Sequence, residues 1–237
     1  MQNLEMLKKL KFKLFLLRDK IKYGRMDRRQ TFEYIYSKKK WDKSGGKAEF
    51  YSGPGSHEDK YVDPYCELIR RFISEHNITE VCDIGCGDFN VASKWLNDSV
   101  QYMGIDIVQK MIDHHNREYA NNHISFQCMD IVEQPLPDAQ LCLVRQVLQH
   151  LNNDEVMQVL KKIKKYKYVI ITESVTEKQY AKEYNSDKAH GSGIRVYNQS
   201  GLYFDEAPFN LKVQTLLEIP CAGERKHEVL ISVLLQK

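Results

Sequence analysis

A short apolar run that ends in an acidic residue and two closely spaced glycines constrains this chain more than any other feature. Residues 81–84, Val-Cys-Asp-Ile, have the character of a buried strand in a parallel sheet. Gly85 and Gly87 follow directly, and glycines there let the backbone turn sharply and approach a ligand closely before a helix begins near Val91. The stretch therefore predicts a strand, a nucleotide-type binding loop and a helix in succession.

The sequence of this loop differs from the dinucleotide-binding fingerprint. The third glycine of G-x-G-x-x-G would fall at Asn90, and a carboxylate, Asp83, stands two residues before the first glycine. Asp-x-Gly-x-Gly resembles the cofactor loop of class I methyltransferases that use S-adenosylmethionine (SAM). In that family the loop backbone lies against the methionine part and the ribose of the cofactor. The family usually has a third glycine where this chain has Phe89.

Beyond the loop, expected strands alternate with expected helices, which is typical of a doubly wound parallel sheet. We place the further strands at 102–107, 124–131, 141–144, 168–173, 211–220 and 228–235. The last two are joined by a turn at 222–224 and form a hairpin, and class I methyltransferases characteristically insert an antiparallel strand there. The sequence therefore predicts an α/β fold with a doubly wound, seven-stranded, mostly parallel sheet that ends in an antiparallel hairpin.

Acidic residues stand at the carboxyl ends of the first three strands. Asp106 follows Asp83 by 23 positions, and an acid there accepts hydrogen bonds from ribose hydroxyls in NAD enzymes and methyltransferases alike. The alternative is that Asp106 only caps the helix that starts near Gln109. For Asp130, the family resemblance implies contact with the exocyclic amine of adenine, and for Ile131 it implies a backbone amide that meets a ring nitrogen. Together the three acids predict one cofactor site.

Further motifs are similar to a little-characterised bacterial branch of the family that is itself similar to glycan-modifying enzymes. This resemblance covers about residues 41–237. It is carried by Trp41 with Ser52-Gly-Pro-Gly-Ser56, Cys86-Gly-Asp-Phe-Asn90, Asp106-Ile-Val, Pro135-Leu-Pro and Val144-Arg-Gln-Val-Leu-Gln-His-Leu151. The branch usually has Asp in place of Gln146 and Trp in place of Val91. We assign cofactor binding to Asp83, Gly85, Cys86, Gly87, Asp106, Ile107, Asp130, Ile131 and Arg145.

Methylation of a hydroxyl acceptor requires removal of a proton, and histidine suits that role because its unperturbed pKa is about 6.5. His150 follows the fourth strand by about one helical turn, in Leu-x-x-His-Leu. The alternative is that this ring hydrogen bonds to backbone within the core. His57, in a glycine-serine segment, and His190, in a long segment, are alternative bases. Asp and His residues are available near the expected pocket, but no pair has a spacing that dictates metal coordination, so no metal ligand is assigned and metal dependence stays open.

Two segments without clear periodicity are candidates for substrate contact. Residues 174–210 leave the carboxyl edge of the sheet and carry aromatic rings beside polar groups, a combination that suits a sugar. Residues 25–60 hold glycine and serine clusters with Trp41, as in a lid over a pocket. A surface excursion is the alternative for the first segment, and a plain linker is the alternative for the second.

The start of the chain has a different composition. Residues 1–40 contain 13 Lys or Arg against 4 Asp or Glu, a net charge of +9 in a chain whose total is +3. An apolar stripe recurs there at spacings of three and four residues: Leu4, Leu7, Leu10, Leu14, Leu17 and Ile21. We therefore divide the chain into a basic, amphipathic N-terminal helical extension, 1–40, and a methyltransferase domain, 41–237. Docking on the domain, self-association and peripheral membrane contact all remain open for the extension.

The remaining composition favours a cytoplasmic enzyme. The six cysteines are scattered without zinc spacing, no signal-peptide core is present, and no apolar run approaches the roughly 20 residues that span a bilayer. The sequence predicts a SAM-dependent O-methyltransferase that acts on a sugar, a sugar nucleotide or another small polar acceptor in surface-glycan biosynthesis. Alternatives are a non-catalytic SAM-binding assembly partner and a methyltransferase of another small molecule or of nucleic acid. Methylation of nucleic acid is the weaker of these alternatives, because no Asn-Pro-Pro-Tyr-like base-flipping motif follows the fourth strand.

Overall fold

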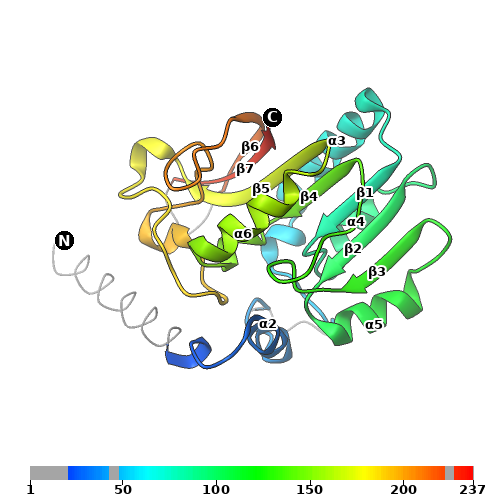
Figure 1. Ribbon diagram of the computed structural model, residues 1–237, viewed down its shortest axis with the longest axis horizontal. Helices are drawn as coiled ribbons and strands as arrows, with labels where there is room; N and C mark the ends of the chain where they lie inside the picture. Colours follow the sequence, from blue (N-terminus) through cyan, green and yellow to red (C-terminus); the bar gives the residue numbers. More distant parts are fainter. Residues whose placement is uncertain (1–20, 43–47, 222–226, 237) are drawn as a thin grey trace.

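A computed structural model of the chain describes residues 21–42, 48–221 and 227–236, and it contains one seven-stranded sheet (Figure 1). Its strand order is β3-β2-β1-β4-β5-β7-β6. Strands β1 to β5 are parallel where they pair, whereas β7 runs antiparallel to both β5 and β6. The strands are β1 (Glu80–Ile84), β2 (Gln101–Asp106), β3 (Ile124–Cys128), β4 (Leu141–Arg145), β5 (Tyr168–Thr176), β6 (Val213–Pro220) and β7 (Glu228–Leu235). The predicted fold class is confirmed.

The strand order reverses between β1 and β4. The chain moves outward from β1 through β2 to β3, and then returns to place β4 on the other side of β1. Crossover connections therefore leave on opposite sides of this pair of strands, and a crevice opens at their carboxyl ends, where ligands of open α/β sheets bind.

Helices cover both faces of the sheet, because side chains of the central strands β1, β2, β4 and β5 alternate between two apolar clusters. Leu141 and Leu143 of β4 pack with α3 and α4, whereas Cys142 and Val144 pack with α6. The helices are α2 (Arg28–Ser37), α3 (Asp59–His76), α4 (Asn90–Trp95), α5 (Gln109–Glu118) and α6 (Asn153–Ile163), with short 3-10 turns η1 (Pro54–Ser56), η2 (Leu148–His150), η3 (Lys178–Tyr180) and η4 (Arg195–Asn198).

Some predicted boundaries were wrong. Helix α3 begins at Asp59, within the segment 25–60 that was expected to lack regular structure, and Pro64 lies inside the helix. Strand β3 ends at Cys128, two residues before Asp130. The segment 25–60, where periodicity is weak, contains α2, whose start is fixed by a capping box between Asp27 and Gln30.

The predicted apolar stripe from Leu4 to Leu17 lies outside the described residues, so that expectation stays a prediction. Among the helices within residues 21–42, 48–221 and 227–236, none combines the length and the apolar character that a membrane crossing requires.

Candidate active site

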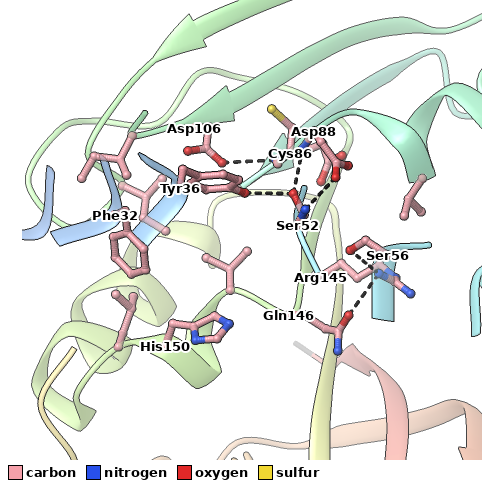
Figure 2. Close-up of a pocket in the computed structure, with 18 of the residues that line it drawn as sticks. Phe32, Tyr36, Ser52, Ser56, Cys86, Asp88, Asp106, Arg145, Gln146 and His150 are labelled. Atoms are coloured by element: carbon pink, nitrogen blue, oxygen red, sulfur yellow. Dashed lines mark hydrogen bonds between the residues drawn. The ribbon is translucent and has the colours of Figure 1, made fainter. Parts of the chain in front are cut away.

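One pocket lies at the carboxyl ends of β1, β2 and β4 (Figure 2). All of the residues predicted to bind the cofactor line it: Asp83, Gly85, Cys86, Gly87, Asp106, Ile107, Asp130, Ile131 and Arg145. The topology brings them together because parallel strands end at the same edge of a sheet. We call this group of residues the cofactor edge.

The glycine loop has a backbone that only glycine adopts readily at two positions. Gly85 and Gly87 have φ of +74° and +56°. A Cβ added at Gly85 would lie 2.3 Å from a methyl group of Val147, and one at Gly87 would lie 2.5 Å from the hydroxyl of Ser52. The loop is therefore both turned sharply and closely surrounded, as a loop that lies against a ligand must be.

Asp106 anchors this loop and the start of α5 at once. One carboxylate oxygen accepts a hydrogen bond from the backbone N–H of Gly87 at 3.2 Å, and the other accepts from Val108 at 3.0 Å. Each oxygen keeps a lone pair that a ribose hydroxyl can use. Burial raises the pKa of Asp106 to about 6. The capping role and the ribose role that the sequence left as alternatives are therefore compatible.

Asp83 and Arg145 both line the pocket, and both charged side chains are largely buried. Burial raises the pKa of Asp83 to about 6, although the hydroxyl of Tyr102, which donates to it at 2.8 Å, and the charge of Arg145 oppose that rise. The Arg145 guanidinium donates to the carbonyl of Gly55 at 2.7 Å and lies 4.9 Å from the ring centre of Tyr65. Burial lowers its pKa. Its buried Nε–H has no hydrogen-bond partner within the described part of the chain.

Asp130 reaches the pocket from the loop that follows β3. Its carboxylate accepts from the backbone N–H of Val132 at 2.9 Å and from the guanidinium of Arg28 at 2.9 Å. Arg28 belongs to α2 and also lines the pocket. Sequence reasoning missed this arginine, because nothing local connects it to Asp130.

Comparison with known proteins agrees with this geometry. Residues 81–166, which span β1 to the end of the α6 region, match the family model described as a methyltransferase domain. The matched segment contains every residue of the cofactor edge, as expected for a SAM-dependent methyltransferase. A search of curated protein sequences returned no match.

Solved structures of methyltransferases share the fold of this domain. The N-methyltransferase NodS from Bradyrhizobium japonicum is 14% identical, with a TM-score of 0.54 over 76% of this chain and 97% of that chain. The magnesium protoporphyrin IX methyltransferase from Synechocystis, solved with bound SAM, is also 14% identical, with a TM-score of 0.54 over 90% of this chain and 98% of that chain. NodS has also been solved with S-adenosylhomocysteine, at a TM-score of 0.53 over 77% of this chain and 90% of that chain and at 14% identity.

The three histidines predicted as bases are not gathered in the methyltransferase pocket. His150 lines it, but its Nδ1 donates to the carbonyl of Gly191 at 3.1 Å and its Nε2 lies 3.4 Å from the amide nitrogen of Gln149. Burial, followed by the charge of Lys188, lowers its pKa to about 3. The ring is therefore neutral at physiological pH, and the geometry favours the alternative in which it hydrogen bonds to backbone.

His57 and His190 lie beside carboxylates outside the residues that line the pocket. Nε2 of His57 lies 2.7 Å from Asp88, which itself lines the pocket. Nδ1 of His190 lies 3.0 Å from Glu155, and its Nε2 lies 3.4 Å from the carbonyl of Met26. A catalytic role for any of the three histidines stays a prediction.

Aromatic side chains from α2 and the segment after it cover the pocket. The ring of Trp41 lies 5.1 Å from Tyr36, 6.5 Å from Phe32 and 5.0 Å from His150, measured between ring centres. The hydroxyl of Tyr36 lies 2.9 Å from that of Ser52. We call residues 28–41 and 52–56 the cover.

The cover includes residues that the sequence analysis assigned to the N-terminal extension. Arg28, Phe32 and Tyr36 are spaced by four residues, so they share one face of α2, and all three line the pocket. This four-residue spacing is the sequence signal that could have identified the pocket-facing side of α2. The signal is weak because it spans only three positions and the rest of the helix is polar.

Within residues 21–42, 48–221 and 227–236, no group of three or more His, Cys, Asp or Glu is arranged to hold a metal ion.

Proposed function

We propose that this methyltransferase transfers the methyl group of SAM to a hydroxyl of a sugar, a sugar nucleotide or another small polar acceptor in surface-glycan biosynthesis. The observation that carries the proposal is the two-sided lining of the pocket. Figure 2 shows Phe32, Tyr36 and His150 on one side and Ser56, Arg145 and Gln146 on the other. Aromatic rings stack on the C–H faces of a sugar, while polar groups hydrogen bond to its hydroxyls.

The cofactor edge fits SAM in its shape and in its donors and acceptors. The positive-φ glycines permit close approach of the loop backbone, and Asp106 offers two oxygens to a ribose. In our proposal Asp130 accepts from the adenine amine, as the family resemblance implies. The unpartnered Nε–H of Arg145 supports a contact with the carboxylate of the methionine part, because a buried donor without an acceptor is costly.

Bound SAM supplies a sulfonium-activated methyl group, so the protein has to position the acceptor, exclude water and provide a route for one proton. The rings of the cover exclude water from the pocket, which strengthens the polar contacts inside it. Because the pKa of His150 is near 3, we propose that this ring positions the segment around Gly191, through its hydrogen bond to that carbonyl. His57, paired with Asp88 at the pocket rim, is then the better candidate for carrying the proton away.

Transfer of tritium from methyl-labelled SAM into purified acceptors tests the proposal. Sugar nucleotides, free sugars, amines and nucleic acid are incubated separately with the enzyme. Label in an alkali-stable ether of a sugar supports the proposed function. Label in an amine or in nucleic acid, with none in the sugars, would contradict the proposed acceptor while leaving the methyltransferase assignment intact.

A separate role for the basic N-terminal extension also remains a proposal. We propose that residues 1–20 serve self-association or attachment to an anionic surface, because 1–40 carry a net charge of +9. Deleting residues 1–20 leaves α2 in place, so SAM affinity should be retained while the mass in solution or vesicle binding changes. An unchanged mass together with unchanged vesicle binding would contradict this role.

A further inference from the structure

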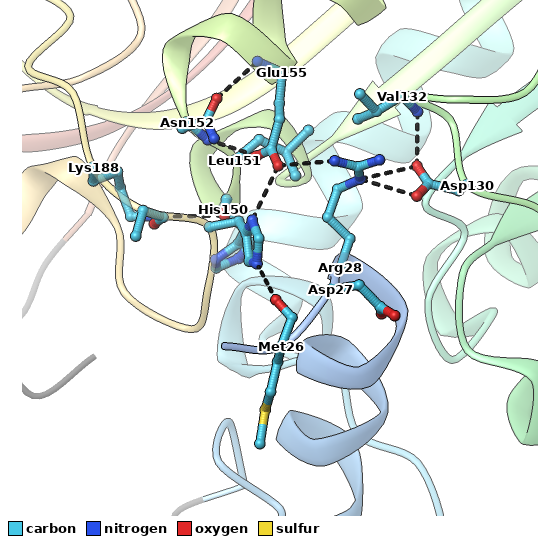
Figure 3. A network of polar contacts seen from close by, with 12 residues as sticks. Met26, Asp27, Arg28, Asp130, Val132, His150, Leu151, Asn152, Glu155 and Lys188 are labelled. Atoms are coloured by element: carbon cyan, nitrogen blue, oxygen red, sulfur yellow. Dashed lines mark hydrogen bonds and ion pairs between the residues drawn. The ribbon is translucent and has the colours of Figure 1, made fainter. Parts of the chain in front are cut away.

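Arg28 is the first residue of α2, and its side chain lines the pocket. Its guanidinium contacts three carboxylates, and Figure 3 shows two of them, Asp130 and Glu155. The Nε atom lies 2.9 Å from Asp130, Nη2 lies 2.5 Å from Glu133, and Nη1 lies 3.1 Å from Glu155. Two of these acids stand in the loop after β3, and Glu155 stands in the first turn of α6. One side chain therefore ties α2 to two segments more than a hundred residues away along the chain.

These ion pairs differ in how well they are shielded from water. The side chain of Arg28 is 16% exposed, that of Asp130 is 19% exposed and that of Glu155 is 7% exposed, whereas that of Glu133 is 67% exposed. An exposed ion pair contributes little because water and salt screen it. Asp130 and Glu155 are therefore the contacts that hold Arg28, and Glu133 adds a weaker one.

Glu155 extends this network to the long segment after β5. One of its oxygens accepts from the backbone N–H of Asn152, in the capping box of α6, and the other faces both Arg28 and His190. Although burial opposes it, the hydrogen bonds from His190, Asn152 and Arg28 lower the pKa of Glu155. His190 also reaches the carbonyl of Met26, just before α2. The start of α2 is thus held from two directions.

Asp130 keeps room for a further donor. Its Oδ1 accepts from Val132 and from Arg28, whereas its Oδ2 accepts from Arg28 at 2.9 Å. A carboxylate oxygen can accept two hydrogen bonds, so a lone pair of Oδ2 remains for an amine that enters the pocket. Arg28 and a bound adenine can therefore contact Asp130 at the same time.

We infer that Arg28 is a cofactor-retaining residue: it closes α2 over the adenine half of the pocket through Asp130 and Glu155. The inference rests on the adenine role of Asp130 in the proposed function. While Arg28 holds these carboxylates, Phe32 and Tyr36 stay over the pocket, because all three side chains share one face of α2. A cofactor can leave only when the guanidinium releases its partners, so Arg28 acts on the rate of dissociation.

The test is stopped-flow measurement of S-adenosylhomocysteine release from the full-length protein, followed by tryptophan fluorescence, since Trp41 and Trp95 line the pocket. Arg28→Ala should speed release by roughly tenfold, which corresponds to about 1.4 kcal/mol, while association changes less. Arg28→Lys should give an intermediate rate, because it keeps the charge but not the fork of donors. Glu133→Gln should have a smaller effect in the same direction.

Arg29→Ala is the matched control. Arg29 has the same charge in the same turn, but its guanidinium donates to the sulfur of Cys128. Release of S-adenosylhomocysteine from Arg29→Ala should stay within about twofold of the wild-type rate. Hydrogen exchange gives a second readout: bound S-adenosylhomocysteine should protect the amides of α2 in the wild type and in Arg29→Ala, but not in Arg28→Ala.

Three outcomes would overturn the inference. Unchanged release from Arg28→Ala and Arg28→Lys would show that the arginine does not retain the ligand. Slower release or tighter binding would show that Arg28 competes with adenine for Asp130. Equal effects of Arg28→Ala and Arg29→Ala would show a general effect of charge. If wild-type protein does not bind S-adenosylhomocysteine at all, the adenine assignment fails as well, so the two failures are distinguishable.

Discussion

The cofactor edge and the cover of the pocket differ in the sequence distance over which their contacts form. At the cofactor edge, Asp106 accepts from backbone groups 19 and 2 residues away. In the cover, Arg28 reaches carboxylates 102 and 127 residues away. Contacts of the first kind leave a motif that can be recognised in the sequence. Contacts of the second kind depend on the finished fold, so the two halves should also respond differently to substitution.

The largest effect is expected at the cofactor edge, for Asp106→Ala. The substitution removes the proposed acceptor for two ribose hydroxyls and leaves the N–H groups of Gly87 and Val108 without their partner, a cost on the order of 1–3 kcal/mol. SAM affinity should therefore fall by roughly 5- to 150-fold, as measured by calorimetry. Asp113→Ala, on the exposed side of α5, is the control and should bind normally. Equal SAM affinities of the two variants would show that Asp106 does not bind the cofactor.

The pH dependence of SAM binding is a second test of the cofactor edge. Burial raises the pKa of Asp106 to about 6, and ribose hydroxyls donate best to the ionised carboxylate. Protonation of this group as the pH falls through 6 should weaken binding, by about tenfold between pH 7 and pH 5. Asp106→Asn should flatten this profile. Asp83 also titrates near pH 6, so a slope that survives in Asp106→Asn would assign the dependence to Asp83.

His150 tests whether a pocket residue that packs against the cover has a chemical or a structural role. Its ring hydrogen bonds to Gly191 and packs against Trp41. We expect His150→Ala to lower the melting temperature and to reduce turnover by less than the roughly 100-fold that loss of a general base costs. Turnover is measured at saturating SAM on the acceptor that becomes labelled. A loss of 100-fold or more in a protein that folds and binds SAM normally would restore His150 as the base.

The smallest effect is expected in the cover, for Tyr36→Phe. The substitution removes the hydroxyl contact with Ser52, which still accepts from the backbone N–H of Asp88. The free energy of unfolding should fall by about 1 kcal/mol, as measured by denaturant titration, because one hydrogen bond is lost. SAM affinity should change by less than about twofold. A much larger loss of affinity would show that the cover binds the cofactor as directly as the strand ends do.

The same contrast explains how much of the molecule could be predicted from its sequence. Asp83, Gly85, Gly87, Asp106 and Asp130 lie in or shortly after strands whose apolar runs are clear, and the order of strands then brings them to one edge. The seven strands were found for the same reason, with ends that differ by a few residues.

The cover was not predictable in the same way. Helix α2 is polar on most sides, so its periodicity is weak, and its role emerges only when Phe32 and Tyr36 meet Trp41 and Ser52. The low pKa of His150 likewise follows from burial by segments far apart in the sequence. An unperturbed pKa was therefore the wrong guide for that residue.

Calorimetric titration of the wild-type protein with SAM, S-adenosylhomocysteine and NADH tests the central claim most directly. In our proposal, the glycine loop, Asp106 and Asp130 form one site for an adenosine that carries a methionine chain. We predict dissociation constants in the micromolar range for SAM and S-adenosylhomocysteine and no measurable heat for NADH. Binding of NADH with no response to SAM would contradict the account.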